Sequence, residues 1–407
     1  MPHSHSHHPP HGHAHSHSHS HPHPHPHPPH HDSDLTPADP DRDHHDPHRT
    51  EAHHQATVQA TFDLYKRHAL ATNQQRRADY YALARSHRAL VPDYNALLAD
   101  VDARLATNAE LVQRMADTNP FPPPTDAALD APAPTEADHE RLRSTLRQCV
   151  RDWSADGKPE RDATYTPILA ALDAAYAGLG PSDKAQIKVL VPGAGLGRLA
   201  WEIVRAGYSC QANEFSLYML IASHFILNHT AAPNAHALHP YLHSLSNVRS
   251  RADLLAPSYV PDVRPDLIAD LDAQFSFAAG DFVDVYGADE QQGQWDSCVT
   301  CFFVDTARNV VRYLEVIHGL LRDGGTWINC GPTLWHFEND PAASSLALTL
   351  DDLKALARRV GFDISDEREI ETCYTTDPRS TLRHTYQAAF WTARKVAPPA
   401  RAEAEGA

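Results

Sequence analysis

The sequence lacks the features of a membrane, secreted or nucleic-acid-binding protein. No apolar run reaches the roughly 18 residues that a membrane span needs, and the first residues lack the apolar stretch of a secretory signal. Lys and Arg number 35 against 52 Asp and Glu, and they form no basic stripe for a phosphate backbone. We therefore expect a soluble, cytoplasmic protein, with the nucleus as a second location, that binds a small molecule and neither nucleic acid nor membrane.

Cysteine is also sparse. Six cysteines are scattered along 407 residues, which is typical of a chain in a reducing compartment. Cys298 and Cys301 form a CxxC, the spacing of many zinc and redox sites. The pair lies in an apolar run without a second CxxC or paired histidines nearby, which favours buried strand residues over a metal or redox role.

Histidine, in contrast, is concentrated at the start of the chain. Residues 1–54 hold 20 of the 31 histidines and offer almost no apolar side chains to offset the entropy of ordering. We expect a disordered tail over 1–55, and a second one over 397–407. Neutral imidazoles in such a tail can bind Zn²⁺, Ni²⁺ or Cu²⁺ loosely, because a flexible array has no preformed geometry. A solvated tail without a dedicated role is the alternative.

The remaining chain divides by pattern. Apolar residues at helical spacing predict an N-terminal helical region over 56–118, and proline density predicts a linker over 119–135. Residues 136–396 begin with helical patterning and then alternate short β-rich runs with helices. This alternation is typical of an α/β domain with a doubly wound, mostly parallel sheet. An insertion at about 228–274 is long enough for a lid or pocket wall, with a plain surface insertion as the alternative.

The expected strands are 187–191, 208–214, 275–279, 296–304 and 326–330, with edge strands at 362–364 and 386–393, the last antiparallel. The expected helices among them are 198–205, 217–227 and 306–321.

A glycine-rich loop follows the first expected strand. Gly193, Gly195 and Gly197 lack the Cβ atom that would keep a ligand away from the backbone. This spacing serves dinucleotides as well as other nucleoside cofactors. Glu214 ends the next strand, where a carboxylate can accept hydrogen bonds from both ribose hydroxyls. A solvated strand-end glutamate is the alternative.

Two further features favour S-adenosylmethionine over a nicotinamide dinucleotide. Asp281 follows the third strand, where its carboxylate can receive the adenine amino group while Phe282 covers the ring. The double-glycine turn at 321–326 resembles a turn common in methyltransferases.

Four separated segments resemble the carnosine N-methyltransferase family: QCVRDWS at 148–154, LVPGAGLGRLAWE at 190–202, TCFFVDTA at 300–307 and WHFEN at 335–339. The resemblance extends over roughly residues 56–395. It implies a Rossmann-like class I methyltransferase fold and methyl transfer from S-adenosylmethionine to the pros nitrogen of carnosine, which gives anserine. It also suggests a homodimer.

The resemblance further implies roles for single residues. In the cofactor site, Gln148 and Arg151 would close over the cofactor, Arg151 on its methionine carboxylate. The other implied cofactor residues are Gly193, Gly195, Glu214, Asp281, Phe282 and Cys301. The implied catalytic and substrate-binding residues are Asp305, His336 and Tyr386. Without the resemblance, the alternatives are a helix N-cap before Thr306 for Asp305, a structural histidine for His336 and a buried aromatic residue for Tyr386.

A mechanism follows from the acceptor itself. A neutral imidazole, with a pKa of about 6.5, presents a lone pair near neutral pH, so neither a strong base nor a metal is needed. Asp305 would accept the N–H of the other ring nitrogen and favour the cationic product. The alternatives are a histidine methyltransferase for proteins or peptides and, from another class, a non-catalytic metal-binding protein with a relic fold. The last predicts a broken motif, and none is visible.

Overall fold

The computed structural model describes residues 47–124, 131–341 and 344–397. Most of both predicted tails, and the predicted metal binding by the first, lie outside the described residues. The first helix begins at Pro47, so the predicted end of the tail at residue 55 is wrong. The helix continues upstream because its next residues are already shielded: Ala56 is buried, and burial lowers the pKa of His54.

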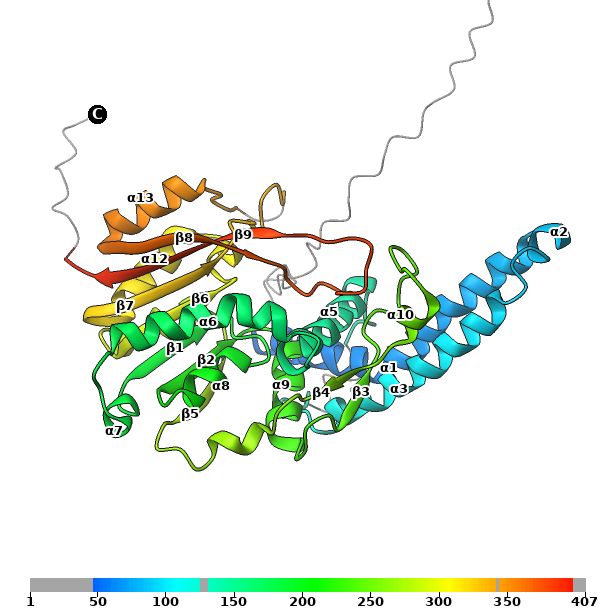
Figure 1. The fold of residues 1–407 in the computed structure, drawn as a ribbon, viewed down its shortest axis with the longest axis horizontal. Coiled ribbons are helices and arrows are strands. Elements are labelled where there is room, and N and C mark those ends of the chain that lie inside the picture. The colour runs from blue at the N-terminus through cyan, green and yellow to red at the C-terminus, as the bar shows by residue number, and fades with distance from the viewer. Residues whose placement is uncertain (1–46, 125–130, 342–343, 398–407) are drawn as a thin grey trace, which may run out of the picture. The chain divides into compact units, whose positions relative to one another are not determined.

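The N-terminal region is helical, as predicted, and its two long helices form a hairpin. Its helices are α1 (Pro47–Ala82), α2 (Arg85–Arg88) and α3 (Tyr94–Asp117). α1 and α3 lie side by side (Figure 1) and share a core that includes Phe62, Val101 and Met115. None of the helices in the described part of the chain is long and apolar enough to cross a bilayer.

The second region is built on a seven-stranded sheet with the order β5-β2-β1-β6-β7-β9-β8. Its strands are β1 (Lys188–Pro192), β2 (Ser209–Glu214), β5 (Phe275–Ala279), β6 (Trp295–Cys301), β7 (Leu321–Gly331), β8 (Phe362–Thr372) and β9 (Tyr386–Lys395). β1 pairs in parallel with β2 and β6, whereas β9 runs antiparallel to β7 and β8. The predicted mostly parallel sheet with an antiparallel last strand is confirmed.

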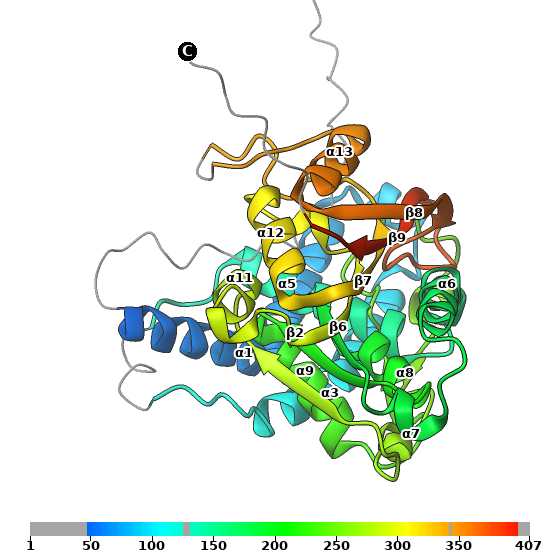
Figure 2. The same cartoon turned by 90° about the vertical axis from the view of Figure 1, so that its left-hand side faces the viewer.

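Helices cover both faces of this sheet (Figure 2). They are α5 (Glu136–Trp153), α6 (Lys158–Ala175), α7 (Pro181–Lys184), α8 (Arg198–Arg205), α9 (Leu217–His229), α11 (Phe282–Tyr286), α12 (Val310–Leu320) and α13 (Leu350–Val360), with short 3-10 turns η1 (Pro265–Ile268), η2 (Asp289–Gln291) and η3 (Val304–Thr306). Val189 and Val191 of β1 pack with α6 and α8, and Leu190 packs on the other face with α11, α12 and α13. Successive side chains of a strand point to opposite faces, so this alternation shows that β1 is buried on both faces of the sheet.

Two predicted boundaries are wrong between β6 and β7. The helix expected from Thr306 begins at Val310, because Asn309 caps it by accepting the backbone N–H of Arg312. The strand expected from Thr326 begins at Leu321, so its double glycine lies inside β7. Gly324 there has φ +72°, a conformation that only glycine adopts at little cost, and the register with β6 shifts nearby.

The insertion at 228–274 is not a plain surface decoration. It contains the two-stranded sheet β3 (His236–Leu238) and β4 (Ser258–Val260) and the helix α10 (Arg251–Leu255). The Asn108 side chain on α3 both donates to the carbonyl of His239 and accepts from its N–H, each at 2.8 Å. The insertion therefore shares a core with the N-terminal helices, and residues 240–248 contribute to the lining of a cavity. A role as a lid or wall of the active site stays a prediction.

Candidate active site

The glycine loop lies at the carboxyl end of β1, as predicted. Gly193 has φ +62°, and a Cβ atom there would stand 2.5 Å from the ring of Phe303. Gly195 has φ +55°, and the nearest atom to a Cβ there would be a carboxylate oxygen of Asp152 at 3.8 Å. Position 193 thus requires glycine because there is no room for a Cβ atom. Both positions favour glycine because their φ is positive.

Glu214 fixes this loop from the end of β2. Its Oε2 accepts the N–H of Gly195 at 2.8 Å, and its Oε1 accepts the N–H groups of Phe215 at 2.9 Å and Ser216 at 2.8 Å. Burial raises the pKa of Glu214, partly offset by these three donors. The alternative of a merely solvated strand-end glutamate is therefore wrong. Since each carboxylate oxygen has two lone pairs, Oε1 is fully used by its two donors, whereas Oε2 keeps one lone pair that can accept a ribose hydroxyl.

The end of α5 packs against the same loop. The indole N–H of Trp153 donates to the carbonyl of Leu196 at 3.1 Å. The guanidinium of Arg198, in the helix that the loop opens, donates to the carbonyl of Asp152 at 2.9 Å. α5 thereby brings Gln148 and Arg151 to the site, where the family resemblance expects them.

Arg151 is the centre of a buried charged cluster. Its guanidinium donates to Asp152 at 2.6 Å and to Glu160 at 2.7 Å, and lies over the rings of Tyr165 and Tyr374 at 5.7 and 4.8 Å. Tyr165, Asp152 and Glu160 all raise the pKa of Arg151, against its burial. Its Nε and Nη1 are thus engaged with the protein's own carboxylates, and the predicted contact with the methionine carboxylate of the cofactor stays a prediction.

Asp281 and Phe282 stand next to Glu214 but carry structural roles as well. Gly280 donates its N–H to the carbonyl of Glu214 at 3.0 Å, which brings the two acidic residues together. Oδ1 of Asp281 caps α11 by accepting the N–H of Val283 at 2.7 Å. The ring of Phe282 is buried in an aromatic cluster with Tyr286, Phe303 and Tyr313. Their adenine roles stay predictions.

The two cysteines of the CxxC point to opposite faces of the sheet. Cys298 packs with the core around α12, whereas Cys301 packs against the core around α6 and lies opposite Cys330 of β7. They cannot share a metal ion, and the described residues contain no cluster of three or more potential metal ligands. Cys301 is within electrostatic reach of Arg151, which helps to lower its pKa after the larger effect of a hydrogen bond from Cys330.

Asp305 and His336 are held together by hydrogen bonds. Oδ2 of Asp305 accepts the N–H of Leu334 at 3.0 Å, and the carbonyl of Asp305 accepts the N–H of His336 at 3.1 Å. Asp305 caps no helix, because η3 has Phe303 at its N-cap position and α12 has Asn309. Asp305 is only 3% exposed, and burial raises its pKa to about 7. Burial also lowers the pKa of His336.

Two aromatic residues that the sequence did not single out connect the two parts of the site. Phe302 follows β6 with φ +54°, a strained conformation for a large side chain. Its ring lies 4.8 Å from that of Tyr374 and 5.9 Å from that of Tyr386, edge to face in the second case. Tyr374 in turn accepts a hydrogen bond from the side-chain amide of Gln148. Tyr386 is therefore linked to the Arg151 cluster through these rings.

Asp152 and Glu160 were also missed by sequence reasoning. Asp152 lies inside the quoted QCVRDWS segment, and its place directly after Arg151 was the available signal. Glu160 gave no signal. It accepts the N–H groups of Thr375 at 3.0 Å and Thr376 at 3.5 Å, contacts across more than 200 residues that no local pattern predicts.

The geometry suits a nucleoside with a charged tail. Two acidic residues follow adjacent strands beside a loop whose glycines leave the backbone accessible, and a buried guanidinium lies within the same edge. The Asp305–His336 pair and Tyr386 come from the strands on the other side of β1. One half can therefore bind a donor and the other can orient an acceptor.

Comparison with known proteins identifies relatives of this chain. Residues 130–397 match the carnosine N-methyltransferase family. The carnosine N-methyltransferase of Rattus norvegicus is 42% identical over 262 residues, 63% of this chain and 64% of the rat protein. That of Schizosaccharomyces pombe is 36% identical over 360 residues, 83% of this chain and 94% of the yeast protein. The match thus spans slightly less than two thirds of the rat protein and nearly all of the yeast protein.

Solved structures show a weaker likeness. The CurJ carbon methyltransferase has a TM-score of 0.38 at 13% identity, covering 77% of this chain and 70% of that chain. The Burkholderia thailandensis 1,6-didemethyltoxoflavin-N1-methyltransferase has a TM-score of 0.35 at 19% identity, covering 66% and 93%.

The order of the strands, the antiparallel β9, the glycine loop after β1 and the acid at the end of β2 define a class I S-adenosylmethionine-dependent methyltransferase fold. Within this class, the chain belongs to the carnosine N-methyltransferase family.

Proposed function

We propose that the protein transfers a methyl group from S-adenosylmethionine to the pros imidazole nitrogen of carnosine or a related histidine dipeptide, with anserine and S-adenosylhomocysteine as products. The observation that carries this proposal is the buried Asp305, hydrogen-bonded to the loop of His336 at the carboxyl edge of the sheet. Membership of the carnosine N-methyltransferase family supports the same acceptor class.

The donor half provides groups of the right kind for the cofactor. Glu214 would accept a ribose hydroxyl at Oε2, Asp281 would accept the adenine amino group, and the glycine loop would approach the amino acid portion. Asp152 is 3% exposed and lies beside Gly195, so its carboxylate suits the α-amino group. When bound, S-adenosylmethionine supplies an electrophilic methyl group on a sulfonium. The chain's own task is to position the acceptor in line with it.

Asp305 orients the acceptor in this proposal. Its ionised carboxylate accepts the N–H of the tele nitrogen, which leaves the lone pair on the pros nitrogen. As methyl transfer places positive charge on the ring, the same carboxylate stabilises it in a site that excludes water. Because burial raises the pKa of Asp305 to about 7, the carboxylate is ionised above neutral pH and protonated below it.

His336 and Tyr386 complete the acceptor half. Burial lowers the pKa of His336, so its ring is neutral at physiological pH and does not repel the cationic product. Tyr386 and Phe302 present an aromatic wall, which attracts an imidazolium through its ring faces.

The experiment that tests the acceptor class is a competition. The protein is incubated with labelled S-adenosylmethionine, carnosine and an unstructured His-containing polypeptide at equal imidazole concentration. Preferential labelling of carnosine supports the proposal, and preferential labelling of the polypeptide favours a peptide or protein acceptor. Absence of transfer to any imidazole, while the cofactor binds, would favour the non-catalytic alternative.

A further inference from the structure

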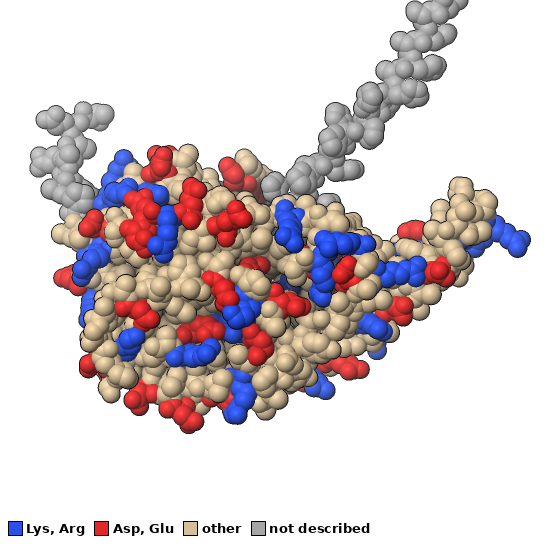
Figure 3. All heavy atoms as spheres, viewed as in Figure 1, with Lys and Arg blue, Asp and Glu red and all other residues tan. Residues whose placement is uncertain are grey.

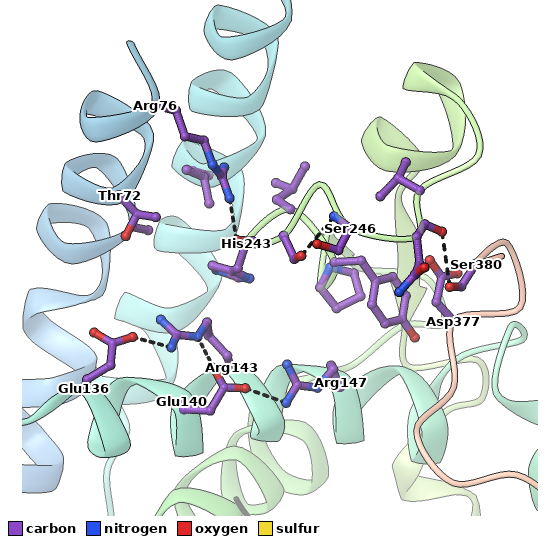
Figure 4. A pocket seen from close by; sticks show the side chains of 18 residues that line it. Thr72, Arg76, Glu136, Glu140, Arg143, Arg147, His243, Ser246, Asp377 and Ser380 are labelled. Carbon is purple, nitrogen blue, oxygen red and sulfur yellow. Dashed lines mark hydrogen bonds and ion pairs between the residues drawn. The ribbon is translucent and has the colours of Figure 1, made fainter. Parts of the chain in front are cut away.

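A cavity of about 340 Å³ lies apart from the active-site residues described above (Figure 4). Its walls come from α1, α3, α5, the insertion and the segment 373–385 between β8 and β9, which we call the strap. None of the predicted cofactor or substrate residues lines it. Its volume is at the lower end of the range for small-molecule sites.

One wall of the cavity is a ladder of ion pairs along α5. Arg143 donates to Glu136 at 2.6 Å and to Glu140 at 2.5 Å, and Arg147 donates to the other oxygen of Glu140 at 2.7 Å. Two carboxylates therefore form ion pairs with two guanidinium groups. This wall is close to neutral and leaves no carboxylate for a further cation.

Arg76, on α1, faces the same cavity without such compensation. Its guanidinium donates to the carbonyl of His243 and, at 3.4 Å, to the amide oxygen of Asn73. It forms no ion pair with a carboxylate of the described residues, whereas its neighbour Arg77 is paired with Asp102. Arg76 is half-buried, and this burial lowers its pKa, the expected direction for a cation that is partly shielded from water without an anion beside it.

The strap closes the opposite side of the cavity with its own charges already paired. Asp377 accepts the N–H of Arg379 at 3.0 Å and its Nε–H at 3.4 Å. Ser380 forms a bridge with Val248 of the insertion. Arg379, which does not line the cavity, forms ion pairs with both Asp377 and Asp156, so Arg76 is the lining arginine that has no carboxylate partner among the described residues.

The approach to the cavity is basic and its body is partly apolar. Arg249 and Arg251 are exposed directly after the lining residue Val248, and Arg383 is exposed on the strap. In Figure 3, basic side chains gather over the strap and beside α10. The lining residues Leu105 and Leu242 are hydrophobic, and Thr72, Ser246 and Ser380 add hydroxyl groups.

We propose that this cavity is a binding site for a small organic carboxylate with an apolar body, whose carboxylate pairs with Arg76. The ligand supplies the anion that Arg76 lacks, and its body packs against the leucine side chains of the wall. Neither the donor nor the acceptor of the methyl transfer has to occupy the site, so the proposal does not depend on the proposed function.

The test uses N-acetyl-L-leucine and its uncharged analogue N-acetyl-L-leucinamide in isothermal titration of the full chain, without donor or acceptor. We expect the acid to bind and the amide to bind at least about tenfold more weakly. Arg76→Gln should weaken binding of the acid at least about tenfold, and Arg76→Lys should restore part of it. Arg77→Gln, next in the chain but paired with Asp102, should leave the dissociation constant within about twofold.

Several results would overturn the proposal. They are equal binding of acid and amide, unchanged binding in Arg76→Gln, tighter binding of inorganic phosphate than of the acid, or no binding of the acid up to roughly 10 mM. If circular dichroism shows that Arg76→Gln is unfolded, Arg147→Gln takes its place. That variant leaves Glu140 with one guanidinium partner instead of two and makes the α5 wall more acidic, so it should weaken binding of the acid; unchanged affinity would then contradict the site.

Discussion

The two halves of the active site are built in different ways. The donor half depends on backbone: glycines with positive φ, a loop fixed by the N–H groups that Glu214 accepts, and an α5 end docked through Trp153. The acceptor half depends on side chains that arrive from three separate strand ends. Its central group, Asp305, is a nearly fully buried carboxyl that accepts the N–H of Leu334.

In the proposed function, the two halves have separate tasks. A site made mainly of backbone atoms suits a cofactor whose structure does not vary. Such a site tolerates little change in its own shape. A buried carboxyl whose pKa is near 7 gains or loses its charge near neutral pH, which changes its interaction with a titratable acceptor. Variants in the donor half should therefore change cofactor affinity, and variants in the acceptor half should change turnover without changing cofactor affinity.

Asp305→Asn should give the largest effect. The amide keeps the shape and can still accept from Leu334, but it cannot stabilise positive charge on the acceptor ring. We expect kcat/KM for carnosine to fall at least about 100-fold, with the dissociation constant for S-adenosylmethionine within about twofold. Asp323→Asn, at a fully exposed aspartate, is the charge-matched control and should change neither. If Asp305→Asn lost S-adenosylmethionine affinity by as large a factor as kcat/KM, the separation between donor half and acceptor half would be contradicted.

Gly193→Ala should act on the donor half instead. A Cβ there would stand 2.5 Å from Phe303, so the loop or the ring must move. We expect S-adenosylmethionine affinity, measured by titration calorimetry, to fall at least about tenfold. Gly178→Ala is a matched control, since Gly178 also has positive φ, at +88°, but has open space around it. It should lose stability of about 1 kcal/mol from the backbone alone and keep its cofactor affinity.

The pH dependence of turnover should distinguish the carboxyl from the acceptor. The acceptor imidazole, with a pKa of about 6.5, and Asp305, with a pKa of about 7, must both lose a proton. Log kcat/KM should therefore fall below pH 6 with a limiting slope approaching 2 in the wild type and about 1 in Asp305→Asn. A slope of 1 in both proteins would mean that Asp305 does not titrate in catalysis.

The same carboxyl should affect stability with a defined sign. Because the pKa of Asp305 is higher in the folded than in the unfolded protein, the folded state retains a proton that the unfolded state releases between about pH 4 and pH 7. Stability from this group is present below pH 4 and is lost as pH rises through 7. Asp305→Asn should therefore gain stability relative to the wild type from pH 4 to pH 8 in denaturant titrations. If the difference in stability between Asp305→Asn and the wild type did not change with pH, the raised pKa of Asp305 would be contradicted.

Tyr374→Phe should give the smallest effect. It removes the hydroxyl that accepts from Gln148 and leaves the ring over Arg151. We expect cofactor affinity to fall about three- to fivefold, roughly 1 kcal/mol. Tyr176→Phe removes a hydroxyl bonded to Asp296 and Ser297 outside the site. It should leave cofactor affinity unchanged, so a similar loss in both variants would point to a general destabilisation.

The sheet was largely predictable because short β-rich runs alternate with helical patterns and because the central strand β1 is apolar on both faces. β5 and α8 have the predicted bounds, and the remaining strands of the sheet are found at the predicted places. The errors fall where pairing with distant strands overrides local signals. Gly324 is typical of a turn but lies inside β7, and the edge strand β8 extends to Thr372 through a charged segment that is stabilised by pairing with β9.

The candidate site was predictable to a different extent in each half. The glycine loop and Glu214 could be read from spacing, since both lie close along the chain. The roles of Asp305, His336 and Tyr386 came only from the family resemblance. Phe302 and Glu160 could not be found, because a strained φ and contacts across more than 200 residues leave no local pattern.

The most direct test of the account is to identify the methylated nitrogen. The protein is incubated with carnosine and S-adenosylmethionine carrying a ¹³C-labelled methyl group, and the product is analysed by long-range ¹H–¹³C NMR. The account predicts a methyl group on the pros nitrogen of the imidazole, with the tele nitrogen bound to Asp305 during transfer. A methyl group on the tele nitrogen or on the β-alanyl amine would contradict it.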